Sequence, residues 1–179
     1  MNWKVAWIPA VPVLLLVLVL AAGFGVDPHA LPSMLDGKPA PPFSLISMTG
    51  ESFDSAVLRG KPVVLNFWAT WCEPCKVEHE ILQQASRYYG SDVQFVGIIY
   101  QDTPEAAAEY LASRSNVFTQ LLDPDSKVAI NYGVAGVPES FFIDGAGRIH
   151  TKQAGAVSPA LLRDEVSKLL GASEQGGVR

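Results

Sequence analysis

The chain has 179 residues, of which 49% are hydrophobic and 17% charged, and its net charge is −5 at pH 7. That length and apolar content are enough for one globular domain with its own core. The negative charge and the scattered Lys and Arg residues exclude a nucleic-acid-binding face, because phosphate contacts need clustered cations. The 2 cysteines are too few for a disulfide-stabilised small fold, so the apolar core has to stabilise the domain.

The first segment, residues 1–26, is predicted to be a transmembrane anchor or a signal. Residues 5–26 carry no charge, and their length matches the roughly 20 apolar residues that a membrane-spanning helix needs. Lys4 precedes this run and Asp27 follows it, so the positive-inside rule places the amino terminus in the cytoplasm. A cleaved signal peptide is the alternative, because small residues such as Gly23 suit a cleavage site. The sequence therefore predicts a domain on the periplasmic, extracytoplasmic side of the cytoplasmic membrane.

Residues 27–37 are rich in proline and small side chains and are predicted to be a tether. The folded domain is expected over residues 38–172, followed by a flexible tail over residues 173–179. Strands are predicted at 43–48, 62–68 and 93–100 and in a hairpin around the turn 144–147, and helices at 72–89, 103–114, 126–133 and 158–170. This alternation predicts an α/β domain with a mixed sheet flanked by helices.

Cys72 and Cys75 lie in the first turn of the predicted helix 72–89, directly after the apolar strand 62–68. A zinc or iron–sulfur site needs about four ligands, and no second matched pair of ligands exists here. A purely structural disulfide over such a short loop removes little chain entropy. A peroxidase would not need the second cysteine. A reactive dithiol fits best, because the helix N-terminus favours the Cys72 thiolate, which attacks, while Cys75 lies one turn deeper and resolves the mixed disulfide.

The segment NFWATWCEPCK, residues 66–76, resembles the thioredoxin active-site signature, and GVPESFFID, residues 136–144, resembles the cis-proline segment that faces it. Further matches follow in order through residues 38–170. The chain is similar to the membrane-anchored thioredoxin-like proteins of cytochrome c maturation, the CcmG/DsbE type, with ResA/TlpA-like proteins as close relatives. This resemblance implies a thioredoxin-like fold whose redox-active Cys72–Cys75 disulfide works without a metal or another cofactor.

Carried over position by position, the resemblance implies that Trp71 flanks the dithiol and that Val137 precedes a cis-proline, Pro138. A cis bond would turn the Val137 main chain toward the dithiol, where it could pair with an extended substrate segment. Glu139 resembles a second acidic position of the subfamily and is expected to shape partner specificity. These four residues form the expected substrate-binding surface.

Asn66 stands where ordinary thioredoxins carry a buried Asp, and an amide side chain cannot take up the proton of Cys75. Glu78 lies three residues after Cys75, on the same helix face, and matches the acidic residue of the maturation subfamily. Glu78 is therefore the predicted proton acceptor, with a solvated surface carboxylate as the alternative. His79 and Tyr132 could contact haem or substrate, but they are expected to be ordinary surface or packing residues.

The charges around the dithiol predict a reductant. Glu73 lies between the cysteines, and Glu78 and Glu139 are expected nearby. Carboxylates oppose thiolate formation, whereas a strong oxidant stabilises its thiolate. Lys76 and the helix N-terminus favour the thiolate, and we expect the three carboxylates to outweigh them.

The resemblance also implies the partners. The expected substrate is a disulfide in the C-x-x-C-H segment of apocytochrome c, which must be reduced before haem attaches. A membrane conduit of the CcdA/DsbD type is expected to resupply electrons. One alternative is a general ResA/TlpA-like envelope reductase with other substrates. The non-enzymatic alternative is a scaffold that holds apocytochrome or haem and uses the fold without its redox chemistry.

Overall fold

The computed structural model describes residues 10–23 and 35–176, which belong to two separate compact units. In the first unit, helix α2 (Ala10–Gly23) has 14 residues and no charged side chain. No helix within the described residues is both long and apolar enough to cross a membrane. The remainder of the predicted anchor, and the tether as far as residue 34, lie outside the described residues. The predicted transmembrane span therefore stays a prediction.

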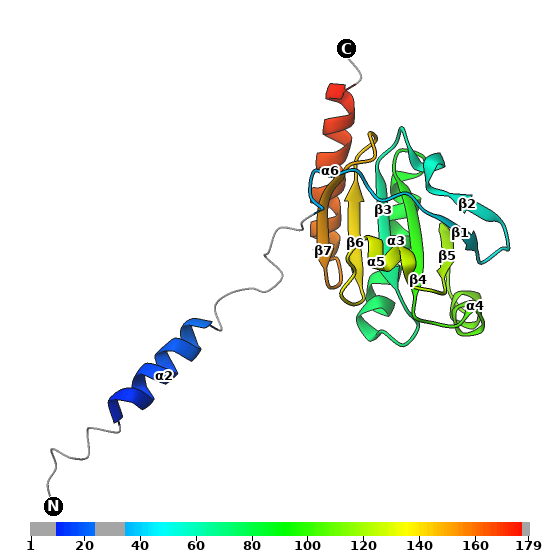
Figure 1. Ribbon diagram of the computed structural model, residues 1–179. Coiled ribbons are helices and arrows are strands. Elements are labelled where there is room, and N and C mark those ends of the chain that lie inside the picture. The colour runs from blue at the N-terminus through cyan, green and yellow to red at the C-terminus, as the bar shows by residue number, and fades with distance from the viewer. Residues whose placement is uncertain (1–9, 24–34, 177–179) are drawn as a thin grey trace, which may run out of the picture. The chain divides into compact units, whose positions relative to one another are not determined.

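The second unit is built on one seven-stranded sheet with the order β2-β1-β5-β4-β3-β6-β7 (Figure 1). Its strands are β1 (Ser44–Ser47), β2 (Ser52–Asp54), β3 (Val63–Trp68), β4 (Gln94–Tyr100), β5 (Thr119–Asp123), β6 (Glu139–Ile143) and β7 (Ile149–Ala154). Its helices are η2 (Ser55–Leu58), α3 (Glu73–Tyr89), α4 (Pro104–Ala112), α5 (Lys127–Asn131) and α6 (Pro159–Gly176). Strands β3, β4 and β5 run parallel and the other pairs are antiparallel, which confirms the predicted mixed sheet.

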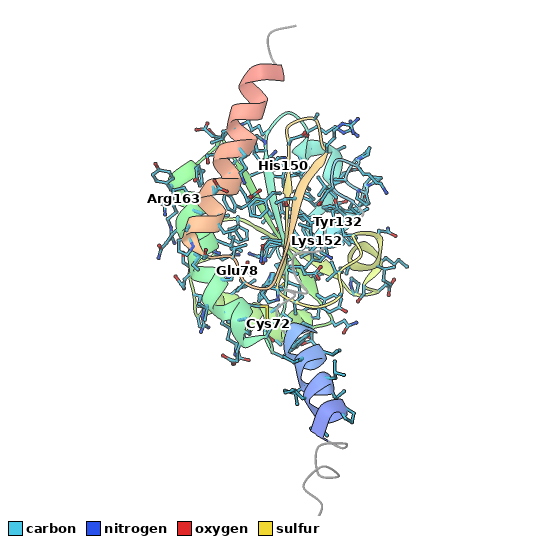
Figure 2. The ribbon with its side chains drawn as sticks, turned by 90° about the vertical axis from the view of Figure 1, so that its left-hand side faces the viewer. Cys72, Glu78, Tyr132, His150, Lys152 and Arg163 are labelled. Carbon is cyan, nitrogen blue, oxygen red and sulfur yellow. A yellow bond between two sulfur atoms is a disulfide. The ribbon has the colours of Figure 1, made fainter. Side chains whose placement is uncertain are left out.

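Strand β3 lies inside the sheet, and all six of its side chains are buried. Alternate side chains point to opposite faces. Phe67 packs in the cluster that includes residues of α5, and Val64 packs in the cluster that includes residues of α3 and α6. Figure 2 shows α3 and α6 on one side of the sheet and α5 on the other. This strand is therefore buried on both faces.

The parallel strands bring their carboxyl ends to one edge of the sheet, and the turns that follow them meet there. The turn after β3 carries the cysteines. Cys72 is the N-cap of α3, and its Sγ accepts a hydrogen bond from the Cys75 N–H at 3.2 Å. The helix ends at Gly90, whose φ of 55° suits glycine. This edge of the sheet therefore carries the dithiol, as predicted from the order of strand and helix.

The elements differ in several details from those predicted from sequence. Helix α5 ends at Asn131, two residues earlier than predicted, and the short helix η2 was not predicted. Strands β2 and β5 were not predicted, because each is short and its side chains do not form a long apolar run. Helix α4 ends at Ala112, two residues earlier than predicted. Helix α6 continues to Gly176 and so includes part of the tail predicted to be flexible. Ala, Glu and Gln after Gly171 favour helix and outweigh that glycine.

Gly97 in β4 has no room for a side chain. A Cβ at this position would lie 2.0 Å from Gln120 Oε1, which accepts a hydrogen bond from Trp68 Nε1 at 2.9 Å. We expect Gly97→Ala to disrupt this contact and lower the free energy of unfolding in urea by about 1–3 kcal/mol. The control Gly171→Ala, where a Cβ meets open space in a helix, should leave stability equal or higher by up to ~1 kcal/mol. Equal stability of the two variants would contradict this packing.

Candidate active site

The two cysteines form a disulfide at the carboxyl end of β3. Their Sγ atoms are 2.02 Å apart, and the residues are only 4% and 2% exposed. Both pack in an apolar cluster with Trp68 and with residues of α4. Cys72 lies at the N-terminal end of α3, as Figure 2 shows, where unpaired N–H groups and the helix dipole favour a thiolate. Of the two sulfurs, Cys72 is therefore the one that the helix N-terminus stabilises as a thiolate.

Trp71 keeps its ring on the surface directly before Cys72. The residue is 57% exposed, and its Nε1 donates a hydrogen bond to the Gln101 carbonyl at 3.1 Å. That bond fixes the indole while leaving an apolar face open. Large rigid aromatic side chains of this kind are favourable contact surfaces for a protein partner. The position agrees with the predicted flanking surface, and the role in binding stays a prediction.

Asp102 supports the turn before the cysteines and was not predicted from sequence. Both the main-chain N–H and the hydroxyl of Thr70 donate to its Oδ2, each at 2.6 Å. Two donors on one carboxylate oxygen hold the turn that carries Trp71 in place. The role of Asp102 could have been inferred from its position just after β4. An acidic residue just after β4 lies at the same sheet edge as the turn after the parallel neighbour β3.

The segment before β6 faces the disulfide. The Val137–Pro138 peptide bond is cis, as predicted. Val137 packs against the apolar cluster that contains both cysteines. Within the described residues, no backbone hydrogen bond involves the N–H or C=O of Val137, whereas the Pro138 carbonyl accepts one from Gly155 at 2.9 Å. The Val137 peptide group is therefore free to pair with an extended strand from another protein.

Glu78 is buried one helical turn after Cys75 and is only 1% exposed. Its Oε1 accepts hydrogen bonds from the Val157 N–H at 3.0 Å and from Ser140 Oγ at 3.3 Å. Its Oε2 accepts one from Asn66 Nδ2 at 3.1 Å. Burial raises the pKa of Glu78 above the usual value, and these three hydrogen bonds offset the effect only in part. The alternative of a solvated surface carboxylate is therefore wrong.

Asn66 is a partner of this carboxyl. Its Nδ2 donates to Glu78 and also to Ser140 Oγ at 3.0 Å, so this hydrogen-bond network links β3, β6 and α3. A buried acid with a raised pKa exchanges its proton closer to neutral pH than an exposed one. Of this pair, Glu78 on helix α3 is therefore the ionisable group, and Asn66 on β3 donates a hydrogen bond to it.

Glu139, the second acidic group predicted near the dithiol, is buried and paired with a cation. It is only 4% exposed, and its Oε2 lies 2.8 Å from Lys152 Nζ. Its Oε1 accepts a hydrogen bond from the Ala135 N–H at 3.2 Å. Because the ammonium group offsets the carboxylate charge, Glu139 opposes a Cys72 thiolate less than the sequence predicted.

Glu73 also has a cationic neighbour. Its carboxylate forms an ion pair of 2.5 Å with Lys76, one turn further along α3, and its side chain is 80% exposed. Water and the neighbouring ammonium group screen an exposed charge of this kind. Of the three carboxylates predicted to act on the dithiol, Glu78 is therefore the one that is both buried and without an ion-pair partner among the described residues.

His79 and Tyr132 are packing residues, as predicted. His79 packs against Trp68 and Tyr110, and burial lowers its pKa. Tyr132 is 1% exposed and donates its hydroxyl to the Pro41 carbonyl at 3.0 Å. Among the described residues, no group of three or more His, Cys, Asp or Glu is arranged to hold a metal ion.

Thiol–disulfide exchange is the chemistry that this geometry can perform. Cys72 lies at a helix N-terminus, Cys75 is within bonding distance of it, and Val137 presents a free peptide group beside them. Together with the mixed sheet, these features define the thioredoxin-like thiol-disulfide oxidoreductases as the class of protein.

Known proteins agree with this class. Residues 35–170 match the Redoxin family. The chain is 40% identical over 166 residues to thiol:disulfide interchange protein DsbE from Pseudomonas fluorescens, which covers 90% of this chain and 92% of that protein. It is 39% identical over 173 residues to thiol:disulfide interchange protein HelX from Rhodobacter capsulatus, with 90% and 97% covered. A crystal structure of a putative DsbE from Chlorobium tepidum matches with a TM-score of 0.73 at 30% identity, covering 78% of this chain and 100% of that one.

The chain belongs to the Redoxin family, among the thiol:disulfide interchange proteins of the DsbE/HelX group. The predicted thioredoxin-like fold and thiol-disulfide oxidoreductase activity are confirmed. The family and the disulfide therefore favour an enzyme over the non-enzymatic scaffold.

Proposed function

We propose that this oxidoreductase works as a reductant outside the cytoplasm. The observation that carries the proposal is the buried Glu78 carboxyl one helical turn after Cys75. A negative charge there opposes ionisation of the thiols, so the reduced pair gains little stability from thiolate formation. A strong oxidant has the opposite arrangement, in which a stabilised thiolate favours the reduced form. A dithiol whose thiolate is not stabilised, as proposed here, gives its electrons to other disulfides.

The proposed reaction moves two electrons to the substrate in two exchange steps. The Cys72 thiolate attacks one sulfur of a substrate disulfide, and the other substrate sulfur leaves as a thiolate and takes up a proton. Cys75 then gives its proton to the Glu78 carboxylate and attacks Cys72 Sγ. The second substrate sulfur leaves as a thiolate and takes up a proton from Glu78 or water. The products are a substrate dithiol and the Cys72–Cys75 disulfide, which is the state present in the structure.

The proposed substrate is the disulfide of the apocytochrome c C-x-x-C-H segment, which must be reduced before haem attaches. The resemblance of the active-site and cis-proline segments to the cytochrome c maturation type supports this choice. The free Val137 peptide group and the exposed Trp71 ring support an extended polypeptide as the substrate. A general envelope reductase with other substrates is the second candidate.

The amino-terminal segment is proposed to anchor the domain to the cytoplasmic membrane. Residues 5–26 are uncharged throughout, and α2 lies within them. An anchor keeps the domain near a membrane conduit of the CcdA/DsbD type, which would return electrons to the Cys72–Cys75 disulfide. A chain recovered in the membrane fraction and resistant to carbonate extraction would support this arrangement, whereas a soluble, shortened chain would show a cleaved signal.

The substrate assignment is tested with the full chain, reduced and purified in detergent. Its rate of reduction is measured on an oxidised C-x-x-C-H peptide from apocytochrome c and on unrelated peptides with a disulfide of the same spacing. We expect the apocytochrome peptide to react at least about tenfold faster, which corresponds to about 1.4 kcal/mol of selective binding. Equal rates on all peptides would instead support the general reductase.

A further inference from the structure

We propose that Lys152 and Glu139 form a clamp that holds the substrate-binding loop, defined as residues 133–138, in its binding conformation. Lys152 is then a positioning residue for protein disulfides. This inference rests on the proposed use of the Val137 peptide group in substrate binding. It does not depend on which protein is the substrate or on the direction of electron flow.

The clamp connects both ends of the loop to one ammonium group. Lys152 Nζ lies 2.8 Å from Glu139 Oε2, directly after the loop, and donates to the Gly133 carbonyl at its start, also at 2.8 Å. The second Glu139 oxygen accepts the Ala135 N–H from inside the loop at 3.2 Å. Three positions along a short segment are thus held through two side chains.

The Lys152–Glu139 ion pair is more shielded from water than a surface ion pair. The Lys152 and Glu139 side chains are 16% and 6% exposed. Lys152 Nζ also lies 5.4 Å from the centre of the Phe141 ring, which itself packs against Tyr132. Charges at such positions are little screened, and removing one partner leaves the other unpaired.

The glycines of the substrate-binding loop would make it flexible without the clamp. It contains Gly133, with a φ of 62°, and Gly136, where a Cβ would meet nothing within 4 Å. Glycine gives a chain more conformations than other residues, so the loop would lose entropy each time a substrate strand paired with Val137. A loop already fixed by the clamp avoids that cost on binding. The clamp should therefore improve substrate binding without altering the chemistry at Cys72.

The test uses the full chain in detergent and the variant Lys152→Met, which keeps the length of the apolar stem and removes the charge. Lys168→Met is the matched control, because the Lys168 side chain is 48% exposed and pairs with Asp164 and Glu165 on α6, remote in sequence from the loop. Two probes are reduced: a synthetic peptide with a disulfide across two intervening residues, and 5,5′-dithiobis(2-nitrobenzoate). The small disulfide presents no peptide strand to Val137.

We expect Lys152→Met to raise KM for the peptide about tenfold, while kcat, the midpoint potential and the rate with the small disulfide change less than about twofold. Lys168→Met should match the wild type on every measure. Lys152→Arg keeps the charge and should recover most of the peptide KM, and it serves as the test if Lys152→Met does not fold. Glu139→Gln should add little to the effect of Lys152→Met, because the two act as one unit.

Two results would overturn the clamp. An unchanged peptide KM in a folded Lys152→Met variant would show that the loop needs no such support. Equal losses on the peptide and the small disulfide, or a shifted potential, would show that the pair acts on the dithiol itself. Failure of the proposed function appears separately, as a lack of preference for the apocytochrome peptide or as an oxidising potential in the wild-type protein.

Discussion

Cys75→Ser should abolish turnover and leave substrate proteins covalently bound to Cys72. Cys72 retains its place at the N-terminus of α3 and still attacks a substrate disulfide, but no second thiol is present to release the product. The mixed disulfide therefore accumulates. It is measured after acid quenching and alkylation, by non-reducing electrophoresis and mass spectrometry of the species bound to the full chain.

Cys72→Ser is the matched control for this trap. It removes the same number of sulfur atoms but leaves only Cys75, which is 2% exposed and lies deeper in α3. It should lose turnover equally and trap no substrate. Equal trapping by both variants would contradict the assignment of Cys72 as the attacking thiol. Trapped apocytochrome would support the proposed substrate, whereas a broad set of envelope proteins would favour the general reductase.

Glu78→Gln should slow the release of substrate from the mixed disulfide by about a hundredfold or more, the usual range for loss of a positioned proton acceptor. Glutamine has the shape of the acid and can still accept the Val157 N–H through its carbonyl, but it cannot take up the Cys75 proton. The step is isolated by forming a thionitrobenzoate adduct on Cys72 and following release of the coloured thiolate in a single turnover.

The pH dependence of the release rate tests the same role of Glu78. Burial raises the pKa of Glu78 from the ordinary 4.5, so the acceptor form is lost as the pH falls through a value above 4.5. The wild-type release rate should fall with that ionisation, and Glu78→Gln should lack this inflection. Glu80→Gln changes an exposed charge on the same helix and should behave as the wild type. A Glu78→Gln variant with wild-type rate and pH profile would show that another group takes the proton.

Much of the site could be predicted from residue order. An apolar strand followed by a helix with cysteines in its first turn placed the dithiol at a strand end, because helix periodicity and strand burial are local properties. The position of Glu78 three residues after Cys75 placed it on the same helix face. Its burial could not be predicted, since the Ser140 and Val157 partners are 62 and 79 residues away in sequence.

Two other contacts at the site could not be predicted because they depend on how the strands pair. Lys152 reaches Glu139 because β6 and β7 pair with Glu139 opposite Ala154, a register that the sequence alone did not define. Asp102 reaches Thr70 only because β3 and β4 are parallel neighbours. A count of nearby carboxylates therefore overestimated the negative charge at the dithiol, and Glu78 remains as the principal group.

The midpoint potential of the Cys72–Cys75 pair tests the proposed reductant most directly. The full chain is equilibrated with glutathione and dithiothreitol redox buffers, and the reduced fraction is measured by thiol alkylation. We expect a potential at or below about −200 mV, in the range of glutaredoxins and thioredoxin. A potential near about −120 mV, that of a strong oxidant, would contradict the proposal that this protein reduces its substrates.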